Sequence, residues 1–139
     1  MSWGCNMIIY SEDSQRNISL GYGILFSVYS TLEVRLKHFC QEISLVEQFL
    51  KTGICESENA LETARQWNLL RDEFSKISPD KAVYDMTDLN KQAPWSGNLS
   101  KVITSCANLY TTDDGQDLLF EIVSILCYAD IAGTKVYIQ

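Results

Sequence analysis

The sequence predicts an α+β fold, in which a small and mostly antiparallel sheet carries helices on one face. Two short runs rich in aromatic and β-branched residues open the chain, and a third run closes it. Segments of helical periodicity lie between them, in the order β–β–α–α–β–α–β, which is typical of two packed layers. With 139 residues, 46% of them hydrophobic and 21% charged, the chain is predicted to form one domain, residues 1–139.

The first two strands are predicted at residues 3–10 and 18–22. The run WGCNMIIY has the composition of a strand and stops at the polar cluster SEDSQRN, after which a second short apolar run begins. Two such runs on either side of a polar cluster indicate a β-hairpin, or a strand followed by a loop.

A helical stripe is the clearest pattern in the chain. Apolar residues recur at alternating steps of four and three at Leu25, Tyr29, Leu32, Leu36, Phe39, Ile43, Val46 and Leu50. An unbroken helix over 24–52 would be about 40 Å long, so we expect a break near Lys37–Gln41, and Gly53 is a natural C-cap. A coiled-coil dimer is the alternative, but fewer than four heptads favour packing within one domain.

The remaining helices and strands are predicted from helix-capping residues and from residues that end a helix. A helix is predicted over 57–77, capped by Ser57 and with Trp67 in the core, and a strand is predicted over 81–85. The run KVITSCANLY is compatible with a short helix. A last helix is predicted to start with Asp113 and Asp114 at its N-cap, to be apolar on nearly every face, and to precede a closing strand in TKVYIQ.

The charge balance restricts the class of partner. A formal net charge of −7 and a pI near 4.6 argue against direct binding to nucleic acid or to an anionic membrane surface. A basic protein partner would be attracted instead. Five cysteines without short repeated spacing, no signal-peptide pattern and no long apolar run predict a cytoplasmic protein without a disulfide framework.

Enzyme signatures are missing, and we expect neither a cofactor nor a bound metal. His38 is the only histidine, and the GYG at residues 21–23 falls far short of a phosphate-binding loop. Asp85, Asp88, Asp113 and Asp114 could bind calcium or act as general acid and base, but they do not have the spacing of an EF-hand.

Trp95 and the four aspartates are the candidate site residues. Trp95 lies between Pro94 and Gly97 on a polar connection, where it either closes one end of the core or offers an aromatic anchor to a partner. Asp113 and Asp114 are explained as helix caps. Asp85 and Asp88 fit two roles equally well, that of turn-forming residues and that of contacts with a partner.

Two stretches of the C-terminal half resemble a family of bacterial immunity proteins called immunity protein seventy. These are SPDKAVYDMTDLNKQAPWSGNLS and NLYTTDDGQDLLFEIVSIL, which together span about residues 78–126. The motif positions are Tyr84-Asp85, Asp88-Leu89, Lys91-Gln92, Pro94-Trp95, Thr112, Asp114-Gly115 and Asp117-Leu118. The chain departs from the family pattern around residues 33–50, where a glycine-containing break is expected and none is present.

The resemblance implies a protein that catalyses nothing. It implies a cytoplasmic antidote that binds the C-terminal toxin domain of a large secreted or surface-delivered protein, often a nuclease, in contact-dependent growth inhibition or related competition between bacteria. On this reading Trp95 packs at the domain edge, the four aspartates flank the contact surface, and the free protein is a monomer or weak homodimer. An acidic adaptor that dimerises through residues 25–50 and a small hydrolase using paired acids remain open.

Overall fold

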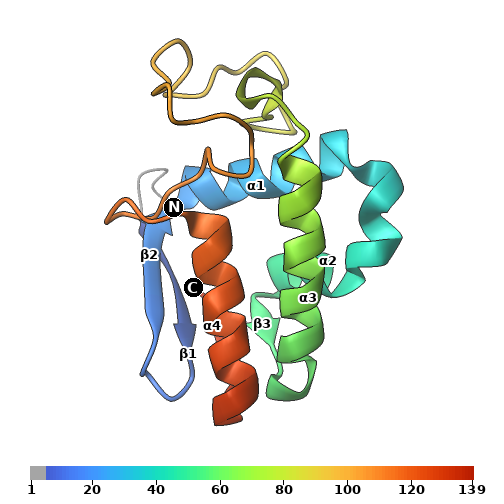
Figure 1. Cartoon of the computed structure of the whole chain (residues 1–139), viewed down its shortest axis with the longest axis vertical. Coiled ribbons are helices and arrows are strands. Elements are labelled where there is room, and N and C mark those ends of the chain that lie inside the picture. The colour runs from blue at the N-terminus through green and yellow to red at the C-terminus, as the bar shows by residue number, and fades with distance from the viewer. Residues whose placement is uncertain (1–5) are drawn as a thin grey trace.

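A computed structural model describes residues 6–139, the side chain of residue 40 excepted. It contains one antiparallel sheet in the order β2-β1-β4-β3, with the helices on one face of it (Figure 1). The strands are β1 (Asn6–Ser11), β2 (Asn17–Gly21), β3 (Ile54–Cys55) and β4 (Val136–Ile138). The α-helices are α1 (Tyr22–Arg35), α2 (Ser44–Thr52), α3 (Ser57–Phe74) and α4 (Leu118–Ala132), and the 3-10 helices are η1 (Lys37–Ile43) and η2 (Pro79–Lys81). The predicted fold class is confirmed.

The sheet joins the two ends of the described chain. The hairpin β1–β2 places Ile9 opposite Ile18, and β4 pairs with the other side of β1, where Ile9 lies opposite Ile138. The first predicted strand is present from Asn6 onward, and its residues 3–5 lie outside the described residues. Strand β3 was not predicted, because its two residues are too few to form a periodic pattern.

The long helical stripe is divided into three pieces, as expected from its length. Helix α1 ends before Leu36 (φ −122°), η1 follows, and α2 begins after Ile43 (φ −126°). Both breaks keep φ negative, so the chain turns here without the glycine that the family pattern led us to expect. Most of the stripe is buried in the molecule's own core, which leaves little of it exposed for a coiled-coil dimer.

Helices α3 and α4 pack against each other over the sheet, and Trp67 on α3 is fully buried as predicted. Two predicted caps are wrong. Ser57 is the first residue of α3 and makes no capping bond. Helix α4 is capped by Asp117, whose Oδ1 accepts from the N–H of Phe120. A turn at Gly115 (φ 83°), closed by a hydrogen bond from Thr112 N to Gln116 O, prevents the helix from starting at 113 or 114.

The stretch from 82 to 117, which we call the loop segment, replaces the predicted 81–85 strand and the 101–110 helix. Apart from an isolated bridge between Thr111 and Asp117, it contains neither strand nor α-helix. It crosses over α1 at the upper end of the molecule (Figure 1). The strand prediction is wrong because side chains of α1, not a neighbouring strand, bind the backbone of Val83.

No helix within residues 6–139 combines the length and the apolar character needed to cross a membrane. Cys55, Cys106 and Cys127 carry free thiols, and the first two are buried.

Candidate partner-binding surface

The loop segment is anchored on one face of α1 that carries only small side chains. Gly23, Ser27, Ser30 and Thr31 recur at helical spacing, and the last three are fully buried. A Cβ at Gly23 would lie 3.1 Å from the hydroxyl of Tyr84, which is tighter than an ordinary carbon–oxygen contact. Small residues are therefore required where the loop segment lies against the helix.

A buried network of hydroxyl groups holds this contact together. The Tyr110 hydroxyl lies 3.0 Å from both Ser27 Oγ and Thr31 Oγ1. Ser27 donates to Val83 O at 2.8 Å, and Val83 N donates to Thr31 Oγ1 at 2.9 Å. Burial raises the pKa of Tyr110 to about 12, so its phenol remains a neutral hydrogen-bonding group at physiological pH.

Trp95 connects this network to the loop surface. Its ring meets the edges of Tyr84 and Tyr110 at centroid distances of 5.7 and 6.1 Å, and Tyr110 in turn lies 6.4 Å from Phe74 in the core. Edge-to-face contacts of this kind stabilise by about 0.5–1.5 kcal/mol each beyond area burial. Trp95 is half-buried and closes one end of the core, which is the first of its two predicted roles.

Asp85 turns inward and braces its own loop. One carboxylate oxygen accepts from Thr87 N at 2.8 Å and from Thr87 Oγ1 at 2.5 Å, and the other lies 4.0 Å from Lys91 Nζ. These hydrogen bonds, with the nearby ammonium, lower the pKa of Asp85. Only 8% of Asp85 is exposed, whereas Asp88 is exposed and accepts from Asn90 N within the same turn.

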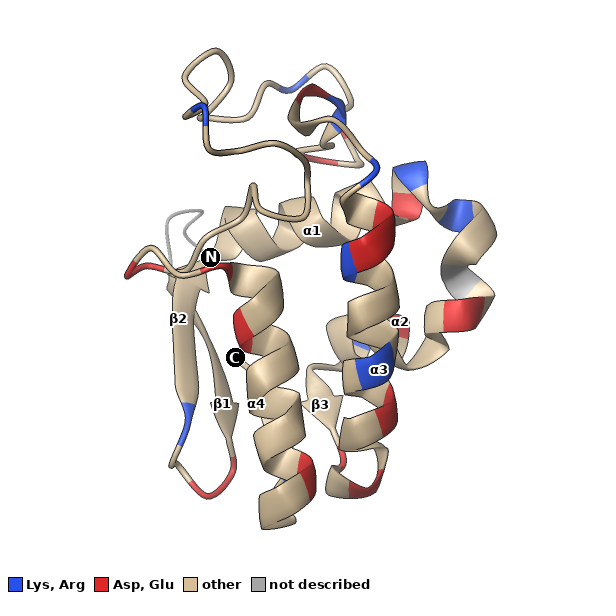
Figure 2. Ribbon diagram, in the orientation of Figure 1, with Lys and Arg blue, Asp and Glu red and all other residues tan. Residues whose placement is uncertain are grey.

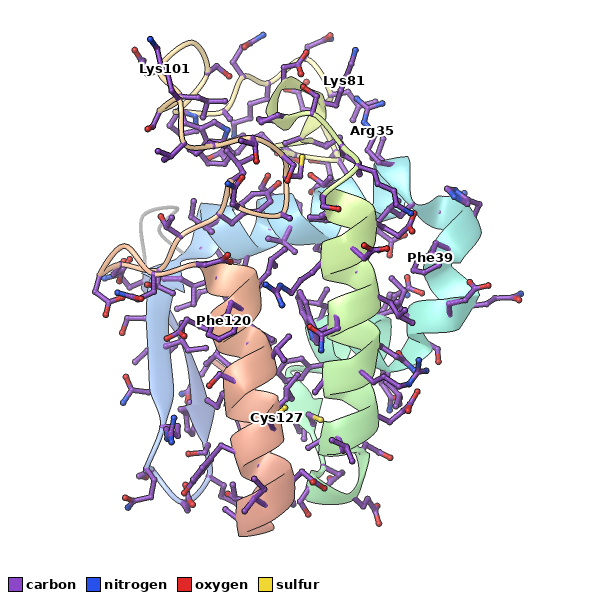
Figure 3. The ribbon with its side chains drawn as sticks, viewed as in Figure 1. Arg35, Phe39, Lys81, Lys101, Phe120 and Cys127 are labelled. Carbon is purple, nitrogen blue, oxygen red and sulfur yellow. The ribbon has the colours of Figure 1, made fainter. Side chains whose placement is uncertain are left out.

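A cleft of about 480 Å³ lies between the C-terminal end of α1 and the loop segment. Its walls include Val34 and Arg35 on the helix, and Tyr84, Leu89, Lys91 and Trp95 on the loop segment. Figure 3 shows the labelled side chains of Arg35, Lys81 and Lys101 at this end of the molecule. The wall is partly aromatic, partly aliphatic and flanked by cations.

Asp113 and Asp114 occupy a different place. Together with Glu121 on α4 they border a hollow of about 210 Å³ beside β2, and Asp113 N donates to Ser19 O at 2.8 Å. This hollow lies by the N-terminal end of α1, whereas the cleft reaches Val34 and Arg35 at its C-terminal end. Helix α1 has 14 residues and is about 20 Å long. The five predicted site residues therefore fall into two groups.

Charge is distributed unevenly over these two places (Figure 2). The turn that precedes α4 is acidic, whereas the upper loops near the cleft carry cations interspersed with acids. On α3, by contrast, cations are matched locally, as in the pair of Arg65 and Glu62 at 2.5 Å and that of Lys76 and Glu73 at 2.9 Å. Surface salt bridges of that kind contribute only about 0–1 kcal/mol each to stability, and their opposite charges largely cancel at the surface of α3.

Sequence reasoning did not identify the cleft. Its residues come from two segments about 50 positions apart, and only the small-residue spacing at Gly23, Ser27 and Thr31 hinted that another part of the chain packs on α1. Within residues 6–139, no group of three or more histidine, cysteine or acidic side chains is arranged to hold a metal ion.

Comparison with known proteins identifies one family. The family model described as immunity protein 70 matches residues 16–138, nearly the whole described chain. No curated protein and no solved structure matches the sequence at the same stringency. The match includes the N-terminal half, which the sequence motifs alone did not cover, and confirms the resemblance.

Proposed function

Because the chain belongs to the immunity protein 70 family, we propose that it neutralises a cognate toxin by binding the toxin's C-terminal domain in the cytoplasm. The toxin is a basic nuclease, an RNase or tRNase, of a contact-dependent growth inhibition system or a related system of bacterial competition. The immunity protein transforms nothing itself and acts by occupying the toxin's surface. The family match over residues 16–138 is the observation that carries this proposal.

The charge of the molecule supports a basic partner. A nuclease must hold phosphate groups, so its substrate surface is rich in lysine and arginine. The immunity protein has a formal net charge of −7, and Asp88, Asp113 and Asp114 are exposed. Carboxylates facing the toxin's cations would speed association and select between toxins.

The predicted contact residues divide into two roles under this proposal. Asp88, Asp113 and Asp114 present carboxylates to the toxin. Asp85 acts from beneath, because its contact with Thr87 fixes its own turn. Trp95 determines the shape of the loop segment through Tyr84 and Tyr110, while its half-buried ring also lines the cleft. In the free state the protein is a monomer or a weak homodimer.

Co-expression tests the proposal directly. The C-terminal domain encoded immediately upstream is expressed in a sensitive strain with and without the immunity protein. Survival with the pair, death with the domain alone, and co-purification of a one-to-one complex are expected. If the cells die in both cases, and the purified immunity protein leaves nuclease activity in extracts unchanged, the proposal is wrong.

A further inference from the structure

The cleft beside α1 has a mixed lining in which large apolar side chains lie among polar ones. Leu89 is 66% exposed and Val34 is 38% exposed, while the half-buried rings of Tyr84 and Trp95 also line the cleft. Concave sites that combine apolar and aromatic side chains with a few placed polar groups are typical of ligand binding. The volume, about 480 Å³, lies within the range of about 300–1,000 Å³ found for concave binding sites.

Arg35 is held in place beside these apolar side chains. Its Nε donates to Lys81 O at 3.0 Å, which orients the guanidinium group at the mouth of the cleft. No carboxylate of the described residues forms a salt bridge with it. An arginine oriented through Nε can still offer its terminal amino groups to a carboxylate, which it binds with charge-assisted hydrogen bonds.

Lys91 adds a second cation on the other wall. Its ammonium lies 5.7 Å from the centroid of the Tyr84 ring and 4.0 Å from Asp85 Oδ2, so it too is positioned by the loop segment. Asp80 is the one acid among the lining residues, and its carboxylate accepts a hydrogen bond from Ser78. Two cations and one acid therefore line the cleft, and Arg35 is the lining cation for which no salt bridge is found among the described residues, in a chain whose formal net charge is −7.

We infer that this cleft binds a segment of the toxin in which a large apolar side chain stands next to an aspartate or glutamate. The inference rests on the proposed function and adds a second contact with the toxin to the one proposed for the exposed aspartates. The apolar side chain enters between Leu89 and Trp95, and the neighbouring carboxylate binds Arg35. Charge complementarity selects this occupant, because Arg35 attracts a carboxylate and would repel a basic side chain in the same place.

The two ends of α1 then recognise opposite charges. Asp113 and Asp114 face cations of the toxin at one end, and Arg35 faces a carboxylate at the other, about 20 Å away along the helix. Reversing the orientation of the toxin would place like charges together at both ends. This arrangement gives selectivity for orientation and for the cognate toxin beyond what a uniformly acidic surface provides.

Matched substitutions test the inference. Arg35→Gln and Leu89→Ser alter the cleft, while Arg65→Gln and Leu61→Ser make the same chemical changes on α3 at side chains that are also exposed. Binding is measured by surface kinetics against the catalytically inactivated domain encoded immediately upstream. Each cleft variant should weaken binding at least tenfold, about 1.4 kcal/mol, chiefly through faster dissociation. Each α3 variant should stay within twofold of the wild type.

A second measurement uses the unaltered protein. Amide hydrogen exchange between residues 84 and 99 should slow when the toxin domain binds, because the occupant covers the loop segment. Unchanged exchange there, or cleft variants that bind like the wild type, would overturn the inference and leave the proposed function standing. Wild-type protein that binds no toxin would overturn both. A dimer in sedimentation that Leu89→Ser abolishes would assign the cleft to a second copy instead.

Discussion

Replacing Thr31 by valine removes one group of the hydrogen bonds that hold the loop segment to α1. Thr31 Oγ1 accepts from Val83 N at 2.9 Å, lies 3.2 Å from Val83 O and lies 3.0 Å from the Tyr110 hydroxyl, and the residue is fully buried. Valine has nearly the same shape and a similar helix propensity. The substitution therefore removes hydrogen bonds without creating a cavity.

The expected loss of stability depends on which hydrogen-bonding groups keep a partner in the variant. Val83 O still accepts from Ser27, and the Tyr110 hydroxyl still has Ser27 as a partner. Val83 N loses its acceptor in a residue that is 7% exposed, and an unpaired buried N–H costs about 1–3 kcal/mol. With about 1 kcal/mol more for the lost bonds of the Thr31 hydroxyl, we expect a destabilisation of about 2–4 kcal/mol.

Urea unfolding followed by circular dichroism measures this loss. With a slope of about 2 kcal/mol per M, the middle of the usual range, the midpoint should fall by about 1–2 M. Thr111→Val, at an exposed threonine, is the control and should leave the midpoint nearly unchanged. A loss below about 0.5 kcal/mol for Thr31→Val would mean that water satisfies Val83 N, and hence that the loop segment is not docked on α1 as described.

Three further outcomes concern Trp95, the exposed aspartates and Tyr110. Trp95→Ala should destabilise the protein by about 1–3 kcal/mol, which is less than the loss when a fully buried tryptophan is truncated. Trp95→Phe should destabilise it by less. Equal melting temperatures for the wild type and both variants would contradict a role in closing the core. Replacing Asp88, Asp113 and Asp114 together by serine should slow toxin association about fivefold at 50 mM salt and less than twofold at 500 mM, and equal association rates at low salt would reject electrostatic steering. Tyr110 should ionise near pH 12, above the value of about 10 for an exposed tyrosine. Because its pKa is raised in the folded state, its contribution to stability is complete below about pH 10 and is lost as the pH rises towards 12. Ultraviolet titration should show the ionisation in this window, and Tyr110→Phe should remove the loss of stability over the same window.

The periodicity of apolar residues predicted the helices whose side chains are buried at regular intervals. The stripe from Leu25 to Leu50 lies largely in the core, and its length alone required the break that η1 provides. Helix α4 was predicted to be central and covered on both sides. It packs on α3 and on three strands, but its outer face is not covered, because Phe120 is 52% exposed and Ile131 is 86% exposed. In each case many side chains make the same kind of contact, so the pattern persists when single residues deviate.

Elements that depend on one or two bonds could not be predicted. Val83 has the composition of a strand residue, but its N–H and C=O are bound by threonine and serine side chains from 52 and 56 positions earlier in the chain. The start of α4 depends on a glycine turn that moves the cap from Asp113 to Asp117. Local pattern contains no signal for contacts between such distant positions.

The motif that identifies the family is in large part a folding motif in this chain. Asp85 binds Thr87, Trp95 packs on Tyr110, and Asp117 caps α4, all within the molecule. Replacing Asp85 or Asp117 would change toxin binding indirectly, through the shape and stability of the loop segment. The motif was therefore sufficient to predict the fold and the class of protein, but the selection of a toxin has to come from side chains that point outward.

Arg35 illustrates why those outward side chains escape detection in the sequence. It is the last residue of α1, where a cation complements the helix dipole, so nothing local distinguishes it. It becomes part of a candidate site only because Lys81 O of η2 accepts its Nε–H and the loop segment adds Leu89 and Trp95 to the same cleft. The same few hydroxyl bonds that dock the loop segment therefore also assemble the cleft. A variant such as Thr31→Val should lose toxin affinity and stability together, whereas Leu89→Ser should lose affinity alone.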